Sequence, residues 1–250
     1  MLPEVEIHSK PNGTLRVVSC NINPQNNDWL ACVLPLLDLE ADVVILLELS
    51  PENSRSIERR GQLVDSRYSH RSFRDWKQGK VSAGAILSKW PLEELSVDET
   101  IGYTEYQHFS LVRHTEGEFV VGLLHPFSPR NQSRWSSGNR IVNTQAAVAA
   151  SHRDMYDIPV LVGCDLNAGP AQIRSRLLRR HSLAMSKPLL RYGGSFPTQS
   201  RIPDPLRLQL DDVWSSDGLV PVAWSMVDAV GSDHKAVIVD FEFSSEMKSD

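Results

Sequence analysis

The chain of 250 residues has little cysteine, no long apolar run and no excess of positive charge. Its three cysteines, Cys20, Cys32 and Cys164, are an odd number without the spacing of a metal site. Cys20 and Cys164 lie inside apolar runs, so we expect small buried side chains in a reducing compartment rather than a disulfide framework. The sequence therefore favours a cytoplasmic location.

A membrane-spanning helix needs about 20 consecutive apolar residues, and the chain has no such run. Residues 29–49 come nearest. Charges and a proline interrupt that segment at Pro35, Asp38, Glu40 and Asp42. The N-terminus also lacks the apolar region of a signal peptide. We expect no transmembrane segment in this chain, although a soluble domain of a membrane-attached protein would show the same features.

The formal net charge of −5 argues against a protein that coats nucleic acid non-specifically, although it allows a local basic patch. No Pro/Gly/Ser-rich linker, change of composition or internal repeat divides the sequence. We therefore expect a single domain over residues 1–250, with its core at about 15–243, and a monomer.

Short β-branched runs alternate with helical patterns. Apolar runs predict strands at residues 15–20, 43–47, 83–87, 119–124, 159–162, 208–214 and 236–243. Helices are predicted after an N-cap at Asp28, over 137–152 and over 172–180. The first of these has apolar positions at Leu30, Val33, Leu34 and Leu37, and Pro35 should kink or shorten it. This mixture predicts an α/β (α+β) sandwich with sheets inside and helices outside.

Polar side chains that suit metal and phosphate chemistry stand at the ends of four predicted strands. A buried polar group must be paired or bound, because leaving it dry and alone costs several kcal/mol. One such residue is commonly a turn residue, but four clusters are hard to explain as turn chemistry. They are Asn21, Glu48, Asp165 with Asn167, and Asp233 with His234.

The composition of these clusters indicates a hard-cation site that handles phosphate. Oxygen ligands from Glu48 and Asp233 suit Mg²⁺ or Mn²⁺. Asn21 and Asn167 add neutral amide groups that fix a water or a phosphate. His234 and His125 can donate hydrogen bonds to a phosphate-centred transition state.

In its motifs the chain resembles the endonuclease/exonuclease/phosphatase (DNase I-like) superfamily, in particular its compact bacterial members. The resemblance implies a four-layer α/β sandwich with two central mixed β-sheets flanked by helices. In GCDLN, Cys164 takes the place of the glycine that usually precedes the aspartate. The motifs follow the family's order: LRVVSCNIN, ADVVILLELS, GAILSKWP, VVGLLHP, PVLVGCDLNAGP, LQLDDVWSS and GSDHKAV.

The same resemblance implies a role for each matching residue. Glu48 resembles the principal metal ligand, with Asn21 beside it and Asp233 completing the metal environment. Asp165 would position or deprotonate the attacking water, and Asn167 would hold Asp165 and the phosphate.

Two histidines complete the implied site. His125 would donate to a phosphate oxygen, and His234 would act as general base or stabilise the phosphate. Asp211 resembles the aspartate that fixes the tautomer of that histidine, although Asp212 directly follows it. The reaction implied is in-line attack of water on a phosphodiester, with Mg²⁺ or Mn²⁺ as cofactor.

Two basic segments are candidates for contact with the substrate. Residues 67–80 interleave cations with Tyr68, Phe73 and Trp76, a pattern for stacking nucleobases or for a packed loop. Arg134 and Arg140 follow His125 and are candidate phosphate contacts. The arginines of residues 172–180 are expected on a solvated face.

The expected substrate is a phosphoester, in nucleic acid or in a phosphorylated lipid or small molecule. A nuclease-like phosphodiesterase is the first hypothesis. The second is a lipid or inositol phosphate phosphatase, for which Trp135, Phe127 and Phe196 could supply an apolar rim. A catalytically inactive binding module is the third, but it should have lost site residues, and none is lost.

Overall fold

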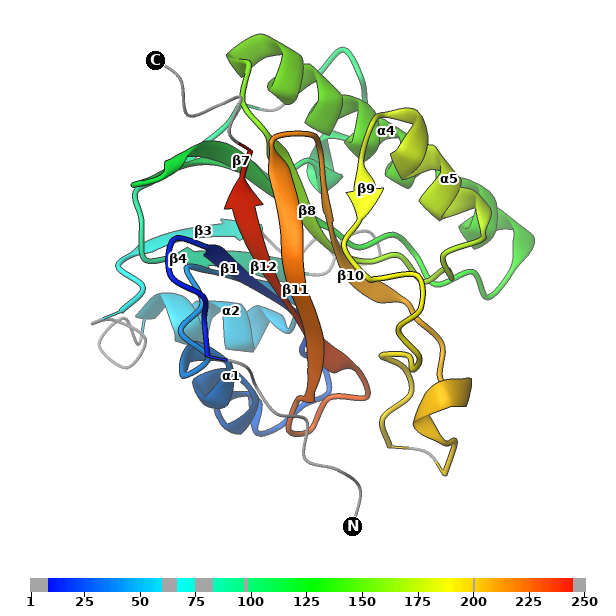
Figure 1. Ribbon diagram of the computed structural model, residues 1–250. Coiled ribbons are helices and arrows are strands. Elements are labelled where there is room, and N and C mark those ends of the chain that lie inside the picture. The colour runs from blue at the N-terminus through cyan, green and yellow to red at the C-terminus, as the bar shows by residue number, and fades with distance from the viewer. Residues whose placement is uncertain (1–8, 60–66, 75–82, 97–98, 200, 245–250) are drawn as a thin grey trace.

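The computed structural model describes residues 9–59, 67–74, 83–96, 99–199 and 201–244. Within them, two six-stranded sheets lie face to face, with helices on their outer sides (Figure 1). The strands of the first sheet run in the order β11 (Leu219–Asp228), β12 (Lys235–Phe243), β1 (Leu15–Asn21), β2 (Val43–Leu49), β4 (Ala83–Ser88) and β3 (His70–Arg74). Strands β1 and β2 are parallel, whereas the other pairs of this sheet are antiparallel.

The second sheet repeats this mixed design. Its strands run in the order β5 (Leu92–Glu94), β6 (Phe109–His114), β7 (Gly117–Leu124), β8 (Val160–Asp165), β10 (Asp211–Ser215) and β9 (Ala184–Met185). Strands β7 and β8 are parallel and the remaining pairs antiparallel.

In the described part of the chain, four helices cover the outer faces of the sheets. Helices α1 (Trp29–Leu37) and α2 (Pro51–Arg59) lie on the first sheet, and α4 (Gln132–Tyr156) and α5 (Ile173–Arg180) lie on the second. Short 3-10 turns, η1 (Thr104–Tyr106) and η2 (Asp204–Leu206), lie in the connections. This is the predicted four-layer sandwich of two mixed sheets flanked by helices. No helix among the described residues has both the length and the apolarity of a membrane span.

Alternation along the strands explains why so many of them are apolar throughout. On β1, Val17 points into the core between the two sheets, whereas Val18 and Cys20 point outward against α1. Successive side chains of a strand face opposite sides, so a strand covered on both faces is apolar at every position. The three cysteines are free and buried, as expected.

The helices match their predictions in place, with shifted limits. Asp28 caps α1 by accepting a hydrogen bond from the Ala31 amide, and α1 ends two residues after Pro35. Its buried face includes Cys32 and Leu36, while Leu34 is exposed, so the predicted apolar face was partly wrong. Helix α4 begins at an Asn131 cap and is longer than predicted at both ends.

Candidate active site

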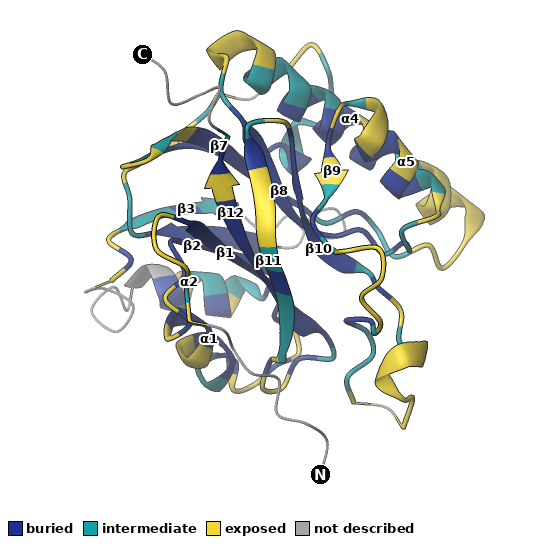
Figure 2. Cartoon of the chain, in the orientation of Figure 1, coloured by how far each residue is buried: buried dark blue, intermediate teal, exposed yellow. Residues whose placement is uncertain are grey.

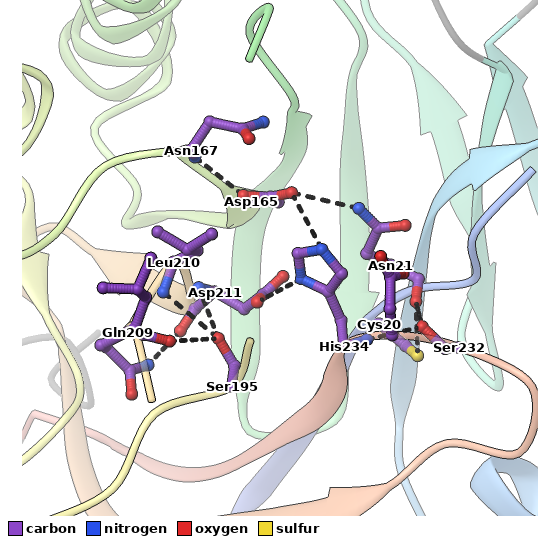
Figure 3. A network of polar contacts seen from close by, with 12 residues as sticks. Cys20, Asn21, Asp165, Asn167, Ser195, Gln209, Leu210, Asp211, Ser232 and His234 are labelled. Atoms are coloured by element: carbon purple, nitrogen blue, oxygen red, sulfur yellow. Dashed lines mark hydrogen bonds and ion pairs between the residues drawn. The ribbon is translucent and has the colours of Figure 1, made fainter. Parts of the chain in front are cut away.

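The predicted polar residues meet at one end of the sandwich, where strands of both sheets terminate. Parallel pairing aligns Asn21 of β1 with Leu47 of β2, and Leu124 of β7 with Cys164 of β8. In the antiparallel pair β8–β10, Asp165 lies directly opposite Asp211. The register of the sheets therefore gathers side chains that are far apart in sequence (Figure 3).

Asp165 is at the centre of this group. Its Oδ2 accepts a hydrogen bond from Asn21 Nδ2 at 3.1 Å and lies 3.6 Å from His125 Nε2 and 3.8 Å from His234 Nε2. Its Oδ1 accepts from the Asn167 amide at 2.8 Å. Burial and the neighbouring charge of Asp211 raise the pKa of Asp165 to about 6. A carboxyl with such a pKa can take up a proton near neutral pH.

His234 is held between two aspartates. Its Nδ1 lies 2.7 Å from Asp211 Oδ2, which leaves Nε2 directed at Asp165 (Figure 3). Burial opposes protonation of the imidazole, but the Asp211 carboxylate outweighs it and raises the pKa of His234 to about 10. The Asp211 amide donates in turn to the Ser195 hydroxyl at 3.2 Å. His234 is therefore an imidazolium at neutral pH.

The neighbouring Asp212 faces away from this site. Its Oδ1 accepts from Trp224 Nε1 at 3.0 Å, and its Oδ2 accepts from the Lys187 amide at 3.1 Å. Consecutive strand residues point to opposite faces, so only one of the two aspartates can reach His234. The ambiguity left open by the sequence is resolved geometrically in favour of Asp211.

Glu48 lies opposite His125, with 2.9 Å between Glu48 Oε1 and His125 Nε2. Its φ of 54° is in the left-handed region, and the β2–β4 register shifts between Leu46 and Leu49. Such a backbone is unfavourable for a non-glycine residue and is characteristic of functional sites. Burial opposes ionisation of Glu48, but His125 outweighs it and lowers the glutamate's pKa. Burial likewise opposes protonation of His125, whose pKa is nevertheless raised by Glu48.

Asn167 connects the strand end of Asp165 to the segment that carries His125. Its φ is 49°, and its Nδ2 lies 3.3 Å from both the Pro126 carbonyl oxygen and His125 Nε2. The structure thus brings together seven of the predicted residues. They are Asn21, Glu48, His125, Asp165, Asn167, Asp211 and His234.

The donor set fits a hard divalent cation. Glu48, Asp165 and Asp211 supply carboxylates, and Asn21 adds an amide oxygen. Ligand atoms of Asp165, Asp211 and His234 all lie within 4.8 Å of one another, and Asp211 Oδ1 is buried without a hydrogen-bond partner among the described residues. A cluster of buried carboxylates is stabilised by positive charge, which an ion would supply.

Three residues predicted for the site have no direct hydrogen bond or ion pair with this group among the described residues. Asp233 is partly exposed, and its carboxylate accepts from Asn23 Nδ2 at 3.1 Å. Arg134 and Arg140 are exposed on α4, where Arg140 lines a surface pocket of about 460 Å³ together with Tyr103 and Trp135. Their proposed contact with phosphate stays a prediction.

Arg174 on α5 is a functional candidate that the sequence pattern does not reveal. The sequence predicts a solvated arginine there, and this prediction is wrong, because Arg174 is buried with 1% of its surface exposed. Its guanidinium donates to the carbonyl oxygens of Leu166 at 2.7 Å and Phe127 at 2.9 Å, and to Asn139 Oδ1 at 3.1 Å. The two carbonyls follow closely after Asp165 and His125 in the chain, so Arg174 ties the two segments together.

Space for Arg174 depends on a glycine of the neighbouring helix. A Cβ at Gly138 on α4 would collide with Nη2 of Arg174. Burial lowers the pKa of Arg174 to about 10, so it remains a cation at neutral pH. A signal for its burial was present, because Leu177 and Leu178 follow at helical spacing and are buried too.

The described part of residues 67–80 does not form an exposed stacking surface. Tyr68 and Arg74 are buried, and Arg67 pairs with Asp38 at 2.8 Å. Trp76, Lys77 and Lys80 lie outside the described residues. In the predicted apolar rim, the Phe196 ring lies 4.7 Å from the His234 ring, whereas Phe127 packs edge-on against Tyr106.

The sequence and the fold are both similar to those of one protein family. The sequence profile of the Endonuclease/Exonuclease/phosphatase family matches residues 18–234. No curated protein matches the sequence. The fold is similar to that of an endonuclease/exonuclease/phosphatase from Beutenbergia cavernae DSM 12333, at 18% identity and a TM-score of 0.64, covering 93% of this chain and 72% of that one.

Two further solved structures show the same likeness. An AP endonuclease from Archaeoglobus fulgidus is 15% identical, with a TM-score of 0.68 and coverage of 91% of this chain and 99% of that one. D. rerio TDP2 complexed with a single strand DNA product is 14% identical, with a TM-score of 0.65 and coverage of 92% and 100%. At these identities the likeness establishes the fold.

Proposed function

We propose that this chain, which belongs to the Endonuclease/Exonuclease/phosphatase family, is a divalent-metal-dependent hydrolase that cleaves phosphodiester bonds by in-line attack of water. The observation that carries the proposal is the linked set Asp211–His234–Asp165, with the Glu48–His125 pair beside it. It combines a carboxyl whose pKa is near neutral with the imidazolium of His234 as a hydrogen-bond donor, as hydrolysis of an anionic ester requires.

Glu48 and Asn21 would hold Mg²⁺ or Mn²⁺, and the predicted role of Asp233 is to complete that environment. The bound ion would neutralise charge on the phosphate and on the leaving oxygen. Glu48 suits this part because its lowered pKa keeps it ionised.

Side chains of the protein would accept the proton of the attacking water, donate a hydrogen bond to the phosphate and orient the catalytic carboxyl group. Asp165 accepts the proton of the attacking water as the new P–O bond forms and the bond to the leaving oxygen breaks. His234 donates from Nε2 to a phosphate oxygen, because its raised pKa makes it a donor rather than a base. Asn167 and Asn21 orient Asp165 through the hydrogen bonds that it accepts.

Two substrate classes compete for this site. The nuclease-like hypothesis is supported by structural neighbours that include an AP endonuclease and TDP2 with a single strand DNA product. The alternative, a lipid or inositol phosphate, is supported by exposed apolar side chains in the segment that contacts His234.

The central test is hydrolysis of bis(p-nitrophenyl) phosphate against its monoester, with Mg²⁺, Mn²⁺ or EDTA. We expect diesterase activity that EDTA abolishes. Glu48→Gln should weaken Mn²⁺ binding, measured by calorimetry, at least about tenfold, because an ionised ligand becomes neutral. Glu116→Gln, on the exposed β6–β7 turn, is the matched control.

Activity that survives EDTA would contradict the metal-dependent reaction. Full activity of Asp165→Asn would contradict its role as the proton acceptor. A panel of plasmid, single-stranded DNA, RNA and lipid phosphates then identifies the substrate class.

A further inference from the structure

The connection between β9 and β10 presents several large apolar side chains to solvent. We call residues 187–208 the apolar loop. Leu189, Leu190 and Tyr192 are 95%, 87% and 85% exposed, and Leu206 and Leu208 are 72% and 57% exposed. The turn η2 projects from the body of the molecule as an exposed segment (Figure 2). Apolar exposure that is concentrated in one segment indicates an interaction site.

In the described part of the apolar loop, residues 187–199 and 201–208, hydrogen bonds hold the two arms together. The amide of Phe196 donates to the Leu208 carbonyl at 3.0 Å, and the Leu208 amide donates back at 2.7 Å. The Gly194 amide also donates to the Asp204 carbonyl at 3.3 Å, in an approach so close that a Cβ at Gly194 would collide with the backbone of Arg207 and Leu208. Leu206 and Leu208 are therefore displayed on a support that backbone hydrogen bonds hold in place.

This support is joined directly to the candidate active site. The amide of Lys235 donates to the Ser195 carbonyl at 2.9 Å, and the Thr198 amide donates to the Asp233 carbonyl at 2.8 Å. The Phe196 ring lies 4.7 Å from the His234 ring. A partner that binds the apolar loop thus binds the same segment that contacts His234.

The charge of the apolar loop is opposite to that of the whole chain. Residues 187–208 contain four cations, Lys187, Arg191, Arg201 and Arg207, and one acid, Asp204, which gives +3 against −5 for the full sequence. Arg191 and Arg201 are exposed among the apolar side chains. Leucines that insert, a tyrosine and arginines suited to anionic headgroups are the composition of a membrane-surface segment.

We propose that the apolar loop docks this protein onto an anionic lipid surface and thereby presents the active site to phosphoesters in the lipid headgroups. The substrate half of this statement rests on the proposed hydrolase function, whereas the docking half does not. Single-stranded nucleic acid fits less well, because Tyr192 is the only strongly exposed aromatic ring in the described part of the loop and leucines do not stack on bases. A second copy of the chain would bring two +3 segments together.

The docking half is tested by sedimentation of the full chain with vesicles of phosphatidylcholine, with and without phosphatidylglycerol. We expect binding to the anionic vesicles. Leu189→Ser/Leu190→Ser/Tyr192→Ser should weaken this binding at least tenfold. The matched control is Met155→Ser/Tyr156→Ser, which removes exposed apolar side chains at the far end of α4 and should change nothing.

Arg191→Gln/Arg201→Gln isolates the electrostatic part. Each arginine near an anionic surface contributes about 1 kcal/mol, so we expect about fivefold weaker binding for each one removed, and a smaller salt dependence. Absence of vesicle binding by the unmodified chain would overturn the proposal, as would an equal loss in the α4 control.

Two further results would also overturn the docking proposal. One is binding of a single-stranded oligonucleotide that needs the three apolar residues while vesicles are ignored. The other is a dimer that dissociates in the triple variant. Vesicle binding requires no turnover, so its failure is distinguishable from failure of the proposed hydrolase, which bis(p-nitrophenyl) phosphate reports.

Discussion

Replacing Arg174 tests whether the two segments that carry His125 and Asp165 need a common anchor. Arg174→Lys keeps the charge, but a single ammonium on a flexible stem cannot reproduce a planar fork that serves three acceptors. A hydrogen bond from a charged group contributes about 1.5–3 kcal/mol, and such terms do not add fully. Losing one or two of the three hydrogen bonds should lower the free energy of unfolding by about 2–4 kcal/mol.

The catalytic effect follows from where the three acceptors lie. Phe127 is two residues after His125, and Leu166 directly follows Asp165. If the hydrogen bonds to these two carbonyl oxygens are lost, the backbone there can move and displace both catalytic side chains. A misplacement of about 1 Å can cost about 100-fold in rate. We expect kcat for the phosphodiester to fall by about 10–100-fold in Arg174→Lys, with a smaller change in KM.

Urea denaturation and steady-state kinetics on the same preparations measure both effects. Arg176→Lys, exposed on the same helix, is the matched control and should stay within about 0.5 kcal/mol of the unmodified protein. Gly138→Ala displaces the guanidinium without removing it and should reproduce the kinetic defect. Wild-type kcat in a destabilised Arg174→Lys protein would refute the positioning role, and wild-type stability would refute the argument from hydrogen bonds.

Two further predictions concern titrating groups. Asp211→Asn removes the charge that raises the pKa of His234, so the imidazole should titrate at lower pH by NMR and kcat should fall about 100-fold; an unchanged pKa would contradict the assignment of this partner. Burial lowers the pKa of His108 to about 4. Between that pH and about 6.5, the histidine is protonated in the unfolded chain and neutral in the folded chain. The free energy of unfolding is therefore unaffected by His108 above pH ~6.5 and falls as the pH is lowered, by about 2 kcal/mol between pH 7.5 and 5. Urea denaturation at the two pH values measures this loss. His108→Gln should lose correspondingly less over that range, and an identical loss in both proteins would show that other groups are responsible.

The strand-end chemistry was readable from the sequence because burial and polarity conflict there locally. Asp165 and Glu48 each follow a run of apolar residues at the end of a strand. This juxtaposition is visible within a few residues of sequence, without tertiary information. The N-cap of α1 at Asp28 is equally local. Strands β3, β5, β6, β9 and β11 and helix α2 were not predicted. Several of them are short, at sheet edges or rich in polar residues, and so lack a distinctive pattern.

By itself, the sequence determined the layered α/β architecture and the polar strand ends at Asn21, Glu48, Asp165 and His234, because periodicity and strand-end motifs are properties of short segments. The family and the parts of His125 and Asp211 came from the resemblance of its ordered motifs to a known family. Only the tertiary structure decided that Asp211 rather than Asp212 holds His234, since that choice depends on which face of β10 meets Asp165. Tertiary contacts likewise decided that Arg174 is buried between two loops and that Leu189 and Leu190 are exposed. Burial depends on what the rest of the chain packs against a residue, and a residue's own neighbours in sequence do not contain that information.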